Sequence, residues 1–183
     1  MERRELFKLL GAGLVVACDG AAQYSNETLA PDVSNYKPRF FSDQEFVTID
    51  ALTEIIIPAD GQSPGAHAAG VGFYIDTVLH YADAQEQQAW RNGLASIEAT
   101  VQSKFGKAFL SSSPTEQDQL VAVMARNERA PATDLERFFP ILKTLTLEAF
   151  ALSKIGMTQY LGYYGNIAQQ EFPGCTHPEH QTI

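Results

Sequence analysis

Three short sequences mark helix starts and constrain the fold of this 183-residue chain more than any other feature. Each has the pattern Ser/Thr-x-x-Glu, in which the hydroxyl and the Glu carboxylate each accept a hydrogen bond from the other residue's backbone N–H at a helix N-terminus. They are Ser42-Asp43-Gln44-Glu45, Ser113-Pro114-Thr115-Glu116 and Thr133-Asp134-Leu135-Glu136. Apolar residues follow at spacings of three and four, and no segment shows the apolar–polar alternation of a strand. The sequence therefore predicts an all-α fold.

About five helices are expected, packed as a compact irregular bundle with extended N- and C-terminal arms. The first spans about 43–57, a shorter one carries residues 71–79, and the third spans about 84–105. The last two open at the second and third capping boxes. The final helix has apolar residues on all sides, so we expect it to be central or covered by something else, with a kink at Pro140.

Changes in composition along the chain predict four parts. Residues 1–18 have the features of an export signal, and 19–40 show no helical or strand period and are interpreted as a linker or arm. Residues 41–154 form the helical domain. Residues 155–183, which are rich in glycine and aromatic residues, are interpreted as a C-terminal docking arm.

The N-terminus has the order of an export signal. Arg3 and Arg4 are followed by Phe7, Lys8 and a short, weakly hydrophobic core. This order resembles the twin-arginine signal, which directs already folded proteins across the bacterial inner membrane. An ordinary amphipathic helix is the alternative, but two glycines in the core would each weaken it by about 1 kcal/mol.

Cys18 ends the apolar core and is a candidate lipidation site. The residues before it resemble a lipobox, in which cleavage in front of the cysteine leaves a thiol for acylation. Cleavage at a neighbouring alanine is the alternative and would leave a soluble periplasmic protein. We expect a periplasmic protein in either case, anchored to the inner membrane only if Cys18 is acylated.

The charge of the chain limits its partners. It has 22 acidic and 13 basic residues, for a formal net charge of −9 at pH 7. This field repels phosphate backbones and anionic lipid, so binding to nucleic acid is disfavoured. No run approaches the roughly 18 apolar residues of a membrane-spanning helix.

Residues that could carry chemistry are few and scattered. No dinucleotide-binding Gly-x-Gly-x-x-Gly, phosphate loop, nucleophile elbow or zinc-binding His-Glu-x-x-His sequence occurs. Asp76 and Glu148 are single acids in apolar stretches and are expected to face solvent. Trp90 is expected in the core, and His67 at the surface or at a helix cap. We therefore predict no catalytic, cofactor-binding or metal-binding residues in this chain.

Cys175, His177 and His180 come closest to a metal-binding cluster. A thiol and two imidazoles can bind a soft or borderline metal. Pro178 prevents their presentation on a helix, and a terminal tail is seldom rigid enough to hold a metal. We favour a polar tail, with metal binding as the alternative.

Motifs in two parts of the chain carry a family resemblance. The first part holds Ile-Ile-Ile-Pro-Ala-Asp (55–60), Pro-Gly-Ala (64–66), Ala-Gly-Val (69–71) and Tyr-Ile-Asp (74–76). The second holds Phe-Phe-Pro-Ile-Leu-Lys-Thr-Leu-Thr-Leu (138–147), Ser-Lys-Ile-Gly-Met-Thr-Gln-Tyr-Leu (153–161) and Pro-Gly-Cys (173–175). Together with the Arg3-Arg4 signal, these motifs resemble the gluconate 2-dehydrogenase subunit 3 family.

The resemblance implies an accessory role in an oxidoreductase complex. It implies a small, non-catalytic subunit of a periplasmic sugar or sugar-acid dehydrogenase, which bears the export signal and escorts the folded large subunit. That large subunit would resemble the glucose-methanol-choline oxidoreductases and carry FAD, and a cytochrome c with haem c could form a third subunit. A stand-alone helical lipoprotein, or a ligand- or metal-binding module, is the alternative.

Residues toward the C-terminus are expected to contact the large subunit. The aromatic candidates are Phe150, Tyr160, Tyr163, Tyr164 and Phe172. Cys175 is the only thiol left for bridging if Cys18 is acylated or removed, and the expected compartment is oxidising. We therefore expect Cys175 to form a disulfide with the catalytic subunit. A buried free thiol and a metal ligand are the alternatives.

Overall fold

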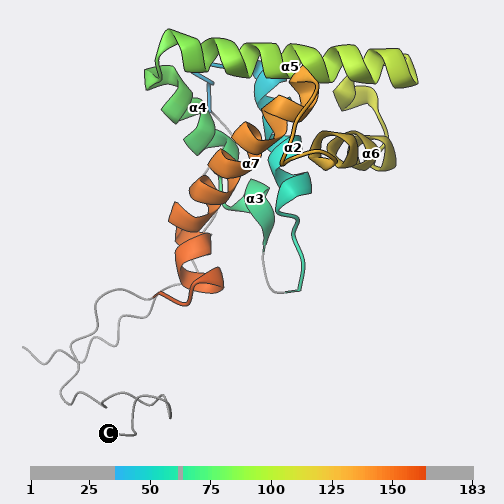
Figure 1. Cartoon of the computed structure of the whole chain (residues 1–183). Helices are drawn as coiled ribbons and strands as arrows, with labels where there is room; N and C mark the ends of the chain where they lie inside the picture. Colours follow the sequence, from blue (N-terminus) through green and yellow to red (C-terminus); the bar gives the residue numbers. More distant parts are fainter. Residues whose placement is uncertain (1–35, 62–63, 164–183) are drawn as a thin grey trace, which may run out of the picture.

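The computed structural model describes residues 36–61 and 64–163, and every regular element in these ranges is helical (Figure 1). The five long helices are α2 (Asp43–Ile56), α4 (Val71–Tyr81), α5 (Ala84–Phe105), α6 (Pro114–Ala125) and α7 (Asp134–Leu152). Three short elements accompany them: α3 (Gly65–Ala68), the 3₁₀-helix η1 (Phe109–Ser111) and the π-helix η2 (Gly156–Tyr160). The predicted all-α fold with about five main helices is confirmed.

All three predicted capping boxes are present. Ser42, Ser113 and Thr133 each accept a hydrogen bond from the backbone N–H of the Glu three residues later, and the Glu side chain accepts one from the cap's backbone. α5 has its predicted bounds because Asp83 caps its start and Gly106, at φ 71°, ends it in the left-handed conformation that glycine adopts readily.

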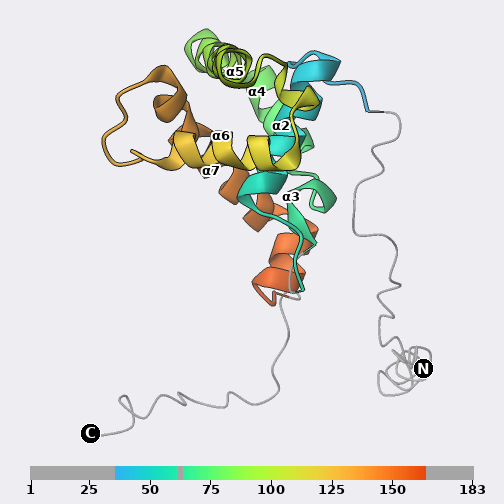
Figure 2. The ribbon, with the colours of Figure 1, turned by 90° about the vertical axis from the view of Figure 1, so that its right-hand side faces the viewer.

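α7 is the central helix of the bundle, as its apolar sequence predicted. It contacts α2, α4, α5 and α6, while α5 lies across one end of the bundle (Figure 1). The view in Figure 2 looks along α5 and places α6 in front of α7. The core side of α7 buries Phe138, Leu142 and Phe150. Pro140 lies inside α7, which continues through it to Leu152.

α5 and α7 approach each other closely at Gly93. A Cβ added there would overlap Cδ2 of Phe138, so the Phe138 ring occupies the space that a side chain at position 93 would need. The Phe138 ring also meets Trp90 edge to face, with 5.2 Å between ring centroids. Trp90 is fully buried, as predicted. This contact fixes where α5 crosses α7.

Asp76 binds the segment before α2 to α4. Its Oδ1 accepts the backbone N–H groups of Phe40 and Phe41, each at 3.0 Å. Its Oδ2 accepts the N–H of Arg39 at 2.8 Å and the hydroxyl of Tyr36 at 2.6 Å. The expectation that Asp76 faces solvent was wrong: it is 0% exposed, because these donors compensate for its burial. The packed body therefore begins before residue 41, within the segment interpreted as a linker.

The same hydrogen bonds govern the ionisation of Asp76 and Tyr36. Burial by itself raises the pKa of Asp76, but the N–H groups of Arg39 and Phe41, the Tyr36 hydroxyl and the N–H of Phe40 together hold this pKa below its ordinary value of 3.8. Burial, followed by the hydrogen bond to Asp76, raises the pKa of Tyr36 to about 12. At neutral pH a charged carboxylate therefore accepts a hydrogen bond from a neutral phenol.

Candidate functional site

Three apolar side chains of α7 are exposed, beside the polar side chains of Thr144 and Glu148. Ile141, Leu147 and Leu152 are 40%, 49% and 60% exposed. In and after η2, which follows α7, Tyr160, Leu161 and Tyr163 are also exposed. We call these six residues the α7 face. Among the described residues, only Val47 and Tyr81 are other large hydrophobic side chains with such exposure. Exposed apolar side chains such as these are available for burial by a partner.

A groove with a volume of about 410 Å³ lies beside this face, between α5 and α7. We call it the α5–α7 groove. Its apolar part comes from Trp90, Pro140, Ile141 and Leu145, and Thr144 adds a hydroxyl. Glu86 of α5 and Glu148 of α7 supply its two carboxylates, and both residues are exposed. The lining thus combines an apolar wall with negative charge and contains no cation.

Two polar groups belong to lining residues of this groove or to their hydrogen-bond partners. The hydroxyl of Tyr74 donates to the Glu148 carboxylate at 3.1 Å. Burial, and then this hydrogen bond, raises the pKa of Tyr74 above 10.0, so Tyr74 is a neutral donor at physiological pH. The indole N–H of Trp90 is buried and has no acceptor in the described part of the chain. Glu148 is exposed as predicted, although it is not isolated.

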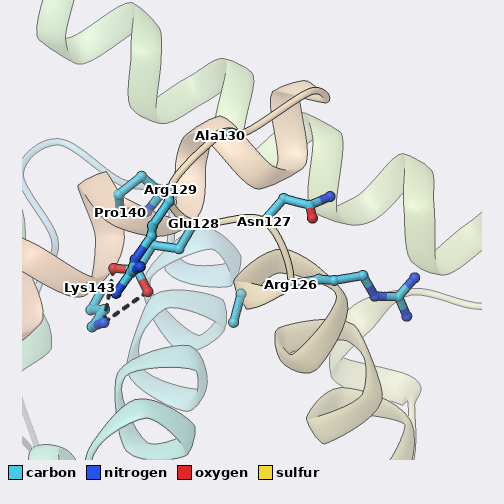
Figure 3. Close-up of a pocket in the computed structure, with 8 residues that line it drawn as sticks. Arg126, Asn127, Glu128, Arg129, Ala130, Pro140 and Lys143 are labelled. Carbon is cyan, nitrogen blue, oxygen red and sulfur yellow. Dashed lines mark hydrogen bonds and ion pairs between the residues drawn. The ribbon is translucent and has the colours of Figure 1, made fainter.

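A larger hollow, about 710 Å³ in volume, lies at the turn between α6 and α7 (Figure 3). Lys143 donates to both carboxylate oxygens of Glu128, at 2.9 and 3.0 Å, whereas Arg126 extends away from this pair (Figure 3). Since Glu128 and Lys143 neutralise each other, the hollow presents no free acid–base pair. Its basic character comes from Arg126 and Arg129.

Among the described residues, His67 and Asp50 form a histidine–carboxylate pair of the kind found in catalytic sites. Its Nδ1 lies 2.6 Å from Oδ2 of Asp50, and its backbone N–H donates to Glu54 at 2.8 Å. His67 was expected at the surface or at a helix cap, and its pairing was not predicted because Asp50 lies 17 positions earlier. The second oxygen of Glu54 accepts the N–H of Ala59. These contacts hold α3 and the loop before it against α2. None of these contacts involves a Ser, Thr or Cys side chain that could act as a nucleophile.

The structure describes three of the predicted functional residues. Tyr160 and Tyr163 are 70% and 46% exposed, so their side chains are accessible to a partner. Phe150 is only 5% exposed and packs edge to face against Tyr160. Phe150 was predicted to contact a partner, but it lies on the inner side of α7 and is a core residue of this chain. The other candidates lie outside the described residues: Arg3, Arg4, Phe7, Lys8, Cys18, Tyr164, Phe172, Cys175, His177 and His180.

Sequence reasoning missed the α5–α7 groove. The signal that could have found it was the presence of apolar residues on all sides of α7. This pattern indicated that the helix is covered, but not which side this chain itself covers. Across residues 36–61 and 64–163, no group of three or more His, Cys, Asp or Glu side chains is placed to hold a metal ion. None of the helices in these ranges combines the length and apolarity needed to cross a bilayer.

The fold and this surface define a small all-α protein that presents apolar and acidic groups around one central helix. The sequence profile of gluconate 2-dehydrogenase subunit 3 matches residues 43–167. The chain therefore belongs to the gluconate 2-dehydrogenase subunit 3 family, and the predicted resemblance is confirmed. The family consists of subunits of a dehydrogenase complex, which implies an oxidoreductase partner. Neither a curated protein nor a solved structure matches the chain.

Proposed function

We propose that this chain is the non-catalytic small subunit of a periplasmic sugar or sugar-acid dehydrogenase. The large subunit carries FAD and performs the oxidation. The small subunit bears the twin-arginine signal at Arg3 and Arg4, escorts the folded large subunit through export, and stabilises it afterwards. Family membership supports the role of a subunit, and the signal-like N-terminus supports the route.

The observation that carries this proposal is the α7 face. Burial of the exposed apolar groups on α7 and the turn after it contributes about 25 cal/mol of binding free energy for each Å² that a partner removes from water. A subunit can use such side chains for association with its partner. Tyr160 and Tyr163 suit such a surface because an aromatic ring buries a large area and its hydroxyl still reaches polar groups.

Co-purification with the flavin-containing subunit tests the proposal. The tagged chain is produced together with the large FAD-dependent oxidoreductase of the same organism and captured. We expect a complex with a flavin spectrum that oxidises gluconate or a related sugar acid with an artificial electron acceptor. The chain produced alone should give only background. Turnover by the isolated chain, or failure to recover a flavoprotein with it, would reject the proposal.

Two further features belong to the same proposal. A cytochrome c with haem c accepts the electrons as a third subunit, and acylation of Cys18 anchors the complex to the inner membrane. Mass spectrometry of the mature chain tests the second feature, since a diacylglycerol on Cys18 adds a defined mass. A mature N-terminus after residue 18 would exclude it.

A stand-alone lipoprotein or metal-binding module is the second candidate, and the Cys175, His177 and His180 cluster favours it. Metal analysis of the purified chain and its Cys175→Ser variant distinguishes the two candidates. Stoichiometric metal that is lost with Cys175, in a chain that captures no flavoprotein, would favour the module.

A further inference from the structure

We propose that the α5–α7 groove binds an apolar side chain of the large subunit, carried on a segment with Lys or Arg residues on both sides of it. This inference rests on the proposed function and names where the partner docks and what chemistry it presents. The groove is separate from Tyr160 and Tyr163, which follow the far end of α7.

The shape and lining of the groove fit an apolar anchor. Its volume of about 410 Å³ exceeds that of one side chain, and Trp90, Ile141 and Leu145 line it from two helices. Ile141 is 40% exposed at its mouth, so an entering side chain would cover an apolar surface that now meets water. Anchors of this kind, seated in a pocket, supply most of the binding energy at protein interfaces.

The negative charges of the groove favour basic residues on both sides of the apolar anchor residue. Glu86 and Glu148 are exposed on opposite helices, and the lining offers no cation to neutralise them. Glu148 accepts a hydrogen bond from a neutral phenol rather than from a base. Two carboxylates beside an apolar wall are complementary to an apolar residue with a cation on each side, and such complementarity favours encounter and orientation.

Self-association is a weaker use of the same groove. Each copy carries a formal charge of −9, so two copies repel each other at low ionic strength. A basic-flanked segment of a different chain meets no such repulsion. We therefore commit to the large subunit as the occupant.

Variants in the groove and matched variants outside it test the inference in the co-produced complex. Ile141→Glu places a charge at the mouth, and Glu86→Lys with Glu148→Lys reverses both carboxylates. Val47→Glu on α2 is the control for the first, since Val47 is 51% exposed and lies outside the groove. Asp43→Lys with Asp118→Lys gives the same change of net charge at two exposed sites elsewhere. Tyr74→Phe removes the bond to Glu148 alone.

The readout is the flavin absorbance recovered for each mole of captured small chain. We expect both groove variants to lower it about tenfold or more, and the controls to change it less than about twofold. Circular dichroism and thermal unfolding of each isolated variant verify its fold. If wild-type chain captures no flavoprotein, the proposed function and this inference both fail. If wild type captures it and both groove variants do so equally well, only the inference fails.

Carboxylate labelling decides the question in the wild-type complex, where folding of a variant has no influence. Carbodiimide with an amine nucleophile should modify Glu86 and Glu148 in the free chain and spare them in the complex, while Asp43 and Asp118 react equally in both. Equal labelling of all four would overturn the inference. So would a dimer of the isolated chain that Ile141→Glu dissociates, since the occupant would then be a second copy.

Discussion

At the residue scale, one carboxylate fixes the segment through which the chain enters the helical bundle. Asp76→Asn keeps the shape but supplies one acceptor oxygen and an NH₂ group that faces N–H donors. We expect a loss of roughly 2–4 kcal/mol in the free energy of unfolding, because buried donors lose their acceptor. Urea unfolding measures it. Asp118→Asn, at an exposed acid, should stay within about 0.5 kcal/mol of wild type. Equal stability of the two variants would contradict the assignment.

The contribution of Asp76 should also depend on pH. Its folded-state pKa is held below 3.8, so the folded protein binds the proton more weakly than the unfolded chain does. The stabilisation is therefore fully present above about pH 4 and is lost as the pH falls through the folded-state pKa. Unfolding free energies measured from pH 7 downward should show the gap between wild type and Asp76→Asn closing only below about pH 4. A gap that closes near neutral pH would implicate another group.

Asp76 also shows which residues sequence patterns cannot place. The donors to its carboxylate lie 35–40 positions earlier in a segment without helical period. A lone acid in an apolar stretch looks solvent-facing unless those donors are known. The pairing of His67 with Asp50 escaped prediction for the same reason, since it depends on how α3 folds back onto α2.

At the scale of the helices, prediction worked where the determining interactions are local. The capping boxes join residues three positions apart, so they placed the starts of α2, α6 and α7 directly. Asp83 and Gly106 similarly mark the start and the end of α5. The short elements α3, η1 and η2 were not predicted, because a few residues carry too little periodicity and depend on the helices around them.

The crossing of α5 and α7 yields the prediction at this scale. Gly93→Ala should lower the free energy of unfolding by about 2–3 kcal/mol, because its Cβ would overlap the Phe138 ring. Gly106→Ala, which has no atom within 4 Å of the added Cβ, tests the left-handed backbone alone and should cost about 1–2 kcal/mol. Thermal unfolding compares them. A Gly93→Ala protein as stable as wild type would mean that α5 and α7 are not held at this distance.

At the scale of the whole molecule, the sequence indicated that α7 is central or covered but not where its uncovered side lies. Leu142 and Ile141 are adjacent in sequence, yet the first is fully buried and the second borders the α5–α7 groove. Deciding between them requires the position of α5, which follows from the contact at Gly93. The prediction that Tyr160 and Tyr163 contact a partner came from composition alone, and composition did not show that Phe150 is buried.

Cys175 provides a prediction about the complex rather than the single chain. In an oxidising compartment, a disulfide to the large subunit would prevent the two subunits from separating under denaturing conditions. Electrophoresis of the native complex without reductant should show one band, which Cys175→Ser converts into two. Separate subunits in the wild-type sample would exclude the disulfide, and metal analysis would then distinguish a free thiol from a metal ligand.

The export route makes the last prediction, because it links the first residues of this chain to the location of another protein. If the large subunit has no signal of its own, it crosses the inner membrane only when bound to a small subunit whose signal works. Replacing Arg3 and Arg4 with Lys keeps the charge but removes the paired guanidinium groups. We expect flavin-dependent dehydrogenase activity to move from the periplasmic to the cytoplasmic fraction, with the large subunit still folded there. Lys37→Arg, a conservative change outside the signal, should leave the distribution unchanged. Periplasmic activity at the wild-type level with the twin-arginine variant would show that the large subunit is exported independently of this chain.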